Sequence, residues 1–135
     1  QETIARFYNS YNGKFTALEE RAETLKTQIE SNRKEIDNLT AAYNIEYDSL
    51  VAAVDDFNAR ASQPNGFVSR AQFDAERASL VARQEELDVS YRELSGLIDT
   101  TNALVEEYNS NVTQIGDLYD SVNSRIEKPD SMIEE

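Results

Sequence analysis

Hydrophobic residues return at alternating steps of three and four along almost the whole chain, and this repeat limits the fold more than any other feature. In the first half the row runs through Ile4, Tyr8, Tyr11, Phe15, Leu18, Ala22, Leu25, Ile29, Asn32, Ile36, Leu39, Tyr43, Tyr47, Leu50, Val54 and Phe57. In the second half it runs through Phe73, Arg77, Leu80, Gln84, Leu87, Tyr91, Leu94, Ile98, Thr101, Val105, Tyr108, Val112, Ile115, Tyr119, Val122 and Ile126. A heptad repeat gathers these side chains in one row along a helix, here called the seam. The pattern therefore predicts two long helices that pack as a coiled coil.

The repeat changes its step at one place in the first half. From Leu39 to Tyr43 and on to Tyr47 the steps are four and four. Such a stutter unwinds a coiled coil locally. We therefore expect the supercoil to loosen near these two tyrosines.

The segment between the two seams, SQPNG at 62–66, carries signals for a turn. Pro64 disfavours the helical conformation for the residue before it. Asn65 and Gly66 form a common turn dipeptide, because both residues tolerate a positive φ angle. Helix one is therefore predicted to end near residue 62.

The residues after the turn carry the signals that begin a helix. Ser69 is placed to cap the helix, and Gln72, three residues later, completes the capping-box pattern. Val68 and Phe73 stand at the positions of a hydrophobic staple. Helix two is therefore predicted to begin near Ser69, and so short a connection favours antiparallel helices.

These patterns predict an all-α fold, a single long antiparallel two-helix coiled-coil hairpin that occupies residues 1–135. The predicted parts are helix one at about 2–62, the turn at about 63–68, helix two at about 69–128, and a tail at 129–135 after the helix-ending Pro129. Folding the chain about residue 65 pairs positions whose numbers add up to about 130. Phe57 then faces Phe73, and Tyr43 faces Leu87. Each arm of roughly 60 residues would extend for about 90 Å.

Composition excludes several functional classes. The chain has 26 acidic and 13 basic residues, a net charge of −13, so nucleic acids and anionic lipid surfaces would repel it. It has no His and no Cys, which removes the usual zinc sites, His-based acid–base pairs and Cys nucleophiles. We therefore predict no enzyme activity, no catalytic residues, no metal and no cofactor. The expected partner is a protein or a second copy of the chain.

No apolar run approaches the length of about 18 residues that a membrane span needs, so we expect no membrane insertion within this chain. The chain begins at Gln1 without a Met, which suggests a piece of a longer protein with room for an anchor upstream.

Two seam positions hold polar residues, Asn32 and Thr101. A buried Asn at such a position fixes the register of a coiled coil at a cost in stability. We predict this role for both residues.

A second stripe runs beside the seam of helix two. Leu97, Leu104 and Leu118 are spaced in sevens, with Asn111 in the gap. One interpretation is an interface for a second hairpin. The other is that the stripe broadens the contact within the hairpin.

The turn region is basic, unlike the rest of the chain. Residues 58–84 hold Arg60, Arg70, Arg77 and Arg83 against Asp74 and Glu76. The candidate docking residues are Arg60, Phe67, Val68, Ser69 and Arg70. The alternative is that these residues only cap the helix and hold solvated charges.

Three short segments resemble the coiled-coil regions of uncharacterised bacterial envelope proteins, some of which precede matrixin-like metalloproteases. They are Asn58-Ala-Arg60 before the turn, the AER run that starts at Ala75, and NALVEEYN at 102–109. The resemblance covers about residues 50–125 and implies a stalk or assembly spacer outside the cytoplasm, in the periplasm or beyond. The HExxH motif of those proteases is absent, so the resemblance implies no protease activity.

A shorter segment, GFVSRAQFDAE at 66–76, is similar to the hairpins of periplasmic adaptor proteins in efflux and secretion systems. In that family the end of the hairpin docks on an outer-membrane channel, which implies docking roles for Arg60, Ser69 and Arg70. The leucine expected between Arg60 and Ser69 is missing, and these 135 residues contain no lipoyl or β-barrel domain.

Overall fold

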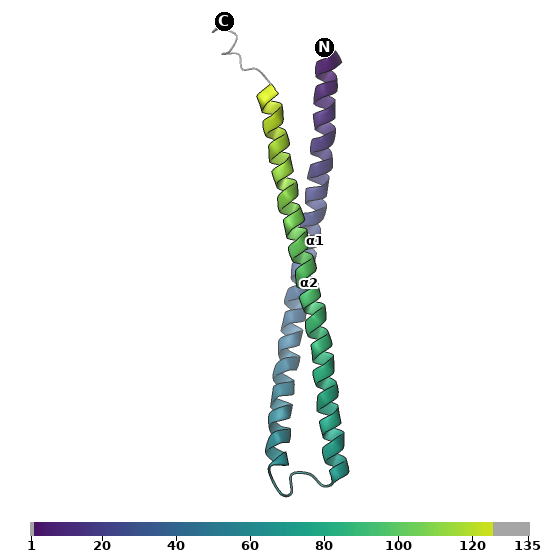
Figure 1. Cartoon of the computed structure of the whole chain (residues 1–135), viewed down its shortest axis with the longest axis vertical. Coiled ribbons are helices and arrows are strands. Elements are labelled where there is room, and N and C mark those ends of the chain that lie inside the picture. The colour runs from purple at the N-terminus through teal and green to yellow at the C-terminus, as the bar shows by residue number, and fades with distance from the viewer. Residues whose placement is uncertain (1, 126–135) are drawn as a thin grey trace. The chain divides into compact units, whose positions relative to one another are not determined.

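Two helices make up the computed structural model, which describes residues 2–125. Helix α1 spans Glu2–Ala61 and helix α2 spans Arg70–Arg125, and no strand occurs within the described range. The predicted all-α helical hairpin is confirmed (Figure 1). Helix α1 ends one residue before the predicted boundary, and α2 begins one residue after it. Ile126, Pro129 and the predicted tail lie outside the described residues.

The chain divides into two units, each of which combines a segment of α1 with a segment of α2. Residues 1–31 and 101–135 form the first, here called the open-end unit. Residues 32–100 form the second, here called the turn unit because it contains the connection between the helices.

The open-end unit buries two apolar side chains of α1. Leu25 has no exposed surface and Ile29 is also buried. Two polar residues of α2, Thr101 and Asn111, are buried with them. Burying a polar group is costly unless it forms hydrogen bonds. The stability of this unit therefore depends on the hydrogen bonds that these two residues form.

The turn unit buries Leu50, Phe57 and Leu94. Phe57 packs on Phe73 with ring centroids 5.1 Å apart, as the register predicted. Tyr43, which the register placed opposite Leu87, packs against Tyr91 with tilted rings whose centroids lie 6.1 Å apart.

Every second residue of the predicted α2 row lies on the inner side of the helix. The row that includes Phe73, Leu80, Leu87, Leu94, Thr101, Tyr108, Ile115 and Val122 is buried or half-buried. Its predicted companions Tyr91, Ile98, Val112 and Tyr119 are all exposed. The inner places are taken by residues one position earlier, among them Leu97, Leu104, Asn111 and Leu118. The buried row can be completed to a heptad repeat either by the predicted residues or by those one position earlier. Hydrophobicity alone favoured the predicted residues, and that prediction was wrong.

Candidate interaction sites

The turn is closed by three phenylalanine rings, one each from α1, the connection and α2. The centroid of Phe67 lies 5.2 Å from that of Phe57 and 5.1 Å from that of Phe73, in an edge-to-face arrangement with the latter. Aromatic pairs of this kind contribute about 0.5–1.5 kcal/mol beyond the burial of their surface. The cluster therefore fixes the connection against both helices.

Arg60 is engaged on several sides within the turn unit. Its two terminal nitrogens donate to the carboxylate oxygens of Glu76 on α2, at 3.1 and 2.8 Å. Its Nε donates to Asp56 at 3.1 Å, and the guanidinium lies 4.7 Å from the ring centroid of Phe67. The hydrogen bonds to Glu76 raise the pKa of Arg60 above its ordinary value. Arg60, one of the predicted docking residues, therefore ties α1 to α2 as a permanent cation.

Gly66 is needed for a different reason from the predicted one. Asn65 and Gly66 were identified as a turn dipeptide because both tolerate a positive φ angle, yet no described residue has one. Instead, a Cβ at Gly66 would lie 1.7 Å from the carbonyl oxygen of Arg60. The connection passes so close to the end of α1 that only a residue without a side chain fits there.

The start of α2 follows the predicted cap but not the predicted staple. Ser69 Oγ accepts a hydrogen bond from the Gln72 N–H at 3.1 Å. The side chain of Gln72 accepts from the Val68 N–H at 2.5 Å. Val68 is 94% exposed, so the predicted staple between Val68 and Phe73 is wrong. Phe67 packs on Phe73 instead, and its ring also contacts that of Phe57.

Of the five predicted docking residues, Val68, Ser69 and Arg70 are exposed, whereas Arg60 and Phe67 are half-buried. Arg60 and Phe67 are held inside the turn, and Ser69 caps α2. Val68 projects into solvent. Arg70 is 84% exposed, although it pairs with Asp74 at 3.1 Å and lies over the ring of Phe73.

The two predicted register residues lie in different units. Thr101 is buried in the open-end unit, and Asn32 is half-buried in the turn unit. Sequence reasoning missed a third polar residue, Asn111, whose Nδ2 donates to the backbone oxygen of Leu18 at 2.6 Å. This hydrogen bond joins α2 to α1 at one axial position and so fixes their register. The signal was the seven-residue spacing of Asn111 from Leu104 and Leu118.

The leucine stripe proposed as an oligomer interface lies on the inner side of α2. Leu97, Leu104 and Leu118 are all half-buried. Asn111, in phase with them, contacts α1 directly. This placement favours the interpretation in which the stripe broadens the contact within the hairpin.

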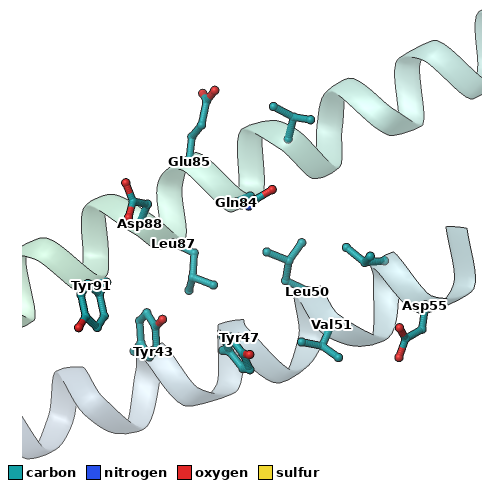
Figure 2. Close-up of a pocket in the computed structure, with 12 residues that line it drawn as sticks. Tyr43, Tyr47, Leu50, Val51, Asp55, Gln84, Glu85, Leu87, Asp88 and Tyr91 are labelled. Atoms are coloured by element: carbon teal, nitrogen blue, oxygen red, sulfur yellow. The ribbon is translucent and has the colours of Figure 1, made fainter. Parts of the chain in front are cut away.

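A groove of about 910 Å³ lies between α1 and α2 in the turn unit (Figure 2). Its walls are formed by Tyr43, Tyr47, Leu50, Val51, Val54, Asp55, Val81, Gln84, Glu85, Leu87, Asp88 and Tyr91. Figure 2 shows Leu50 and Leu87 pointing toward one another from opposite helices. No residue of this groove was singled out as a site from the sequence.

Three tyrosines line one end of the groove. The ring centroid of Tyr43 lies 6.1 Å from that of Tyr47 on the same helix and 6.1 Å from that of Tyr91 on α2. Two successive steps of four turn the side chain of Tyr47 away from the seam, and Tyr47 is 49% exposed. The predicted stutter thus lies where the groove begins.

The charged residues of the groove are all acidic. Asp55, Glu85 and Asp88 are among its twelve lining residues, and no Lys or Arg is. Asp88 pairs with Arg92 at 2.8 Å. The groove therefore combines an apolar, aromatic interior with a negatively charged edge.

Neither described helix contains a stretch apolar enough to cross a membrane. Within residues 2–125, no three acidic side chains gather into a group that could hold a metal ion. Comparisons with models of known protein families, with curated proteins and with solved structures give no match.

Proposed function

We propose that this chain is a non-catalytic interaction module, a helical hairpin that serves as a stalk or assembly spacer in a protein of the bacterial cell envelope. One observation carries the proposal. Five large apolar side chains are buried among the described residues, whereas eleven are exposed. Exposed apolar surface that gathers in patches marks a site for another protein. A hairpin with this surplus is suited to assembly.

The stalk and envelope parts of the proposal have their own support. Sixty helical residues rise about 90 Å along a helix axis, which suits a spacer between two partners. The placement in a bacterial envelope rests on the resemblance of residues 50–125 to coiled-coil regions of envelope proteins. Fractionation of cells that produce the tagged protein tests it, and recovery in the cytosol would refute it.

Site-specific photo-cross-linking tests the interaction itself. A photoreactive residue replaces exposed apolar Val51, Val68 or Tyr119 in turn, and exposed Lys34 serves as the polar control. We expect cross-links to another polypeptide, or to a second copy, from at least one apolar position and none from Lys34. The absence of cross-links from all three apolar positions would overturn the proposal.

A second candidate function is docking through the turn, as in adaptor hairpins. The observation that favours it is the exposed Val68, carried on a connection that the phenylalanine cluster and Arg60 hold in place. An exposed apolar residue on a rigid support loses little conformational entropy when it binds.

The exposed residues, and not Arg60, are the ones to change in a test of docking. With the photoreactive residue at exposed Asn65 of the connection, Val68→Asp with Arg70→Glu should abolish cross-linking from the turn and leave helicity unchanged. Arg60→Ala is the structural comparison, since it should loosen the turn without removing any exposed apolar surface. Docking would be refuted if the double variant still cross-links at the turn with the same yield.

A further inference from the structure

We propose that the groove of the turn unit binds a cationic amphipathic helix of a partner protein. The proposal rests on the proposed function, because it names the class of partner that the interaction module takes. It concerns the surface lined by residues 43–55 of α1 and 81–91 of α2.

The shape of the groove fits a third helix. Its walls come from two antiparallel helices, so the space between them is elongated along both axes. Residues 43–55 rise about 18 Å along α1, which corresponds to about two heptads of a helix laid beside them. An amphipathic helix that places its apolar face in a hydrophobic groove is a common mode of recognition.

The surface of the groove supplies apolar contacts on both walls. On the α1 side Tyr47 and Val51 are 49% and 42% exposed, and on the α2 side Val81 and Tyr91 are 40% and 56% exposed. All four side chains would lose solvent contact under a partner helix. Tyrosine rings also attract cations over their faces.

The charge of the groove favours a foreign partner over a second copy. Three carboxylates and no basic residue line the groove; Asp88 is paired with Arg92, whereas no ion pair of Asp55 or Glu85 occurs among the described residues, and the whole chain has a net charge of −13. In a twofold dimer through this groove the same carboxylates would meet each other, because each copy presents the same patch. Helix-flanking Lys or Arg residues on a partner would instead be attracted.

The basic turn region of a second copy is a poorer occupant, because three of its four arginines are already engaged. Arg60 already holds Glu76 and Asp56, and Arg70 holds Asp74. Arg83 donates to Ser49 within the same hairpin, at 3.1 Å. These engaged side chains would have to give up their contacts to enter a groove.

The probe for the test is a fluorescent three-heptad peptide with Leu at the inner positions and Lys or Arg at the flanking ones. A matched peptide carries Glu at the flanking positions. Fluorescence anisotropy with the full chain should show binding of the cationic peptide that weakens with salt, and no binding of the acidic one. Equal binding of both peptides, or of neither, would overturn the proposal.

Matched variants locate the binding surface. Val51→Asn with Val81→Asn removes apolar surface from both groove walls, and we expect binding to weaken about tenfold or more. Val89→Asn with Val112→Asn is the control, because both valines are exposed but neither lines the groove. Circular dichroism checks that both variants keep their helicity. Equal losses in the two variants would contradict a role for the groove.

A second pair of variants tests the charge. Asp55→Asn with Glu85→Gln should weaken binding about fivefold at low salt, since rim charges contribute modestly and are screened. Glu35→Gln with Asp37→Asn makes the same change in net charge outside the groove and should have little effect. Equal effects would show that only the total charge matters, against a specific groove.

Light scattering shows whether the groove is occupied by a second copy of the chain instead of a foreign helix. A dimer that the Val51→Asn and Val81→Asn variant breaks would identify a second copy and refute the foreign partner. If no peptide binds but cross-links persist at Val68 or Tyr119, the groove is refuted while the interaction module stands.

Discussion

The two units share the same heptad pattern but differ in how many apolar side chains they expose. Among the residues whose side chains the structure describes, eleven large apolar side chains are exposed; nine of them belong to the turn unit, and Val112 and Tyr119 belong to the open-end unit. Polar contacts between the helices of the open-end unit include Tyr11 with Ser121, the buried Asn111 with Leu18, and Arg21 with Glu107. The turn unit also has polar contacts between its helices, Arg60 with Glu76 and Arg83 with Ser49, but it adds the aromatic cluster at its connection, and its groove leaves apolar side chains in solvent.

The difference shows that one heptad seam can both align the two helices and leave apolar surface for another molecule. Where buried polar groups are paired across the helices, the hairpin specifies its own register. Where the stutter turns side chains away from the partner helix, apolar surface is left for another molecule. The following experiments test whether the units differ in energy as they do in packing.

The largest expected difference concerns the two leucine cores. Leu25→Ala should reduce the free energy of unfolding by about 2–5 kcal/mol, because a fully buried side chain leaves a cavity. Leu50→Ala should have a smaller effect, since Leu50 borders the open groove and water can enter. Urea unfolding followed by circular dichroism measures both values.

Leu39→Ala serves as the reference for an exposed leucine, because Leu39 is 37% exposed. If Leu50→Ala costs as much as Leu25→Ala, the turn unit is packed as closely as the open-end unit and the comparison fails.

The next effect concerns the connection. Gly66→Ala should destabilise the hairpin by about 1–3 kcal/mol, because the added methyl group would overlap the carbonyl of Arg60. Gly96→Ala is the matched control in the same unit, where nothing lies within 4 Å of the new Cβ. That control should stabilise α2 by about 0.5–1 kcal/mol. Thermal melts that shift in the same direction for both variants would contradict the close approach.

A smaller effect is expected from the buried amide of the open-end unit. Asn111→Ala should lower stability by about 1 kcal/mol, the net contribution of one hydrogen bond. Asn102→Ala, at an exposed position of the same helix, should change stability little.

The alignment of α1 with α2 can be measured separately in the Asn111→Ala variant. The chain has no cysteine, so a cysteine pair introduced at Arg21 and Glu107 reports the alignment of the helices through a short bifunctional thiol reagent, which spans the gap that the two long side chains bridge. We expect efficient cross-linking in the parent and mixed registers in the Asn111→Ala variant. Unchanged cross-linking would show that the hydrogen bond does not set the register.

The smallest effect is expected at the surface of the open-end unit. Arg21 donates to Glu107 from two nitrogens, at 3.0 and 2.6 Å, with both side chains 47% exposed. Arg21→Ala should cost about 0.2–1 kcal/mol, and high salt should remove most of the difference. Arg92→Ala, which removes a pair within one helix, is the comparison for a contact that does not join α1 to α2. A larger loss at Arg92 than at Arg21 would contradict a contribution from the bond between the helices.

The helices and the turn were predictable because their signals are local. Heptad spacing, the cap at Ser69 and the pairing of Phe57 with Phe73 depend on short stretches and on a symmetric fold about the connection. The inner row of α2 was not predictable, because its two alternatives differ by one residue. The choice between Asn111 and Val112 depends on a carbonyl of α1, which hydrophobicity does not describe.

The groove was not predictable for a related reason. A stutter indicates that winding changes near Tyr43 and Tyr47, but the space left between the helices depends on how both backbones respond. The role of Gly66 likewise depends on where Arg60 ends its helix. Each of these features results from two segments brought close in space.

The contacts of the turn also bear on the order in which the molecule folds. Arg60 and Glu76 are 16 residues apart in the chain, whereas Leu18 and Asn111 are 93 apart. Closing a short loop loses less chain entropy than closing a long one, so we expect the hairpin to zip from its connection toward its open end. In stopped-flow measurements Phe57→Leu should then slow folding, while Asn111→Ala should mainly speed unfolding. Slower folding of the Asn111 variant would reverse that order.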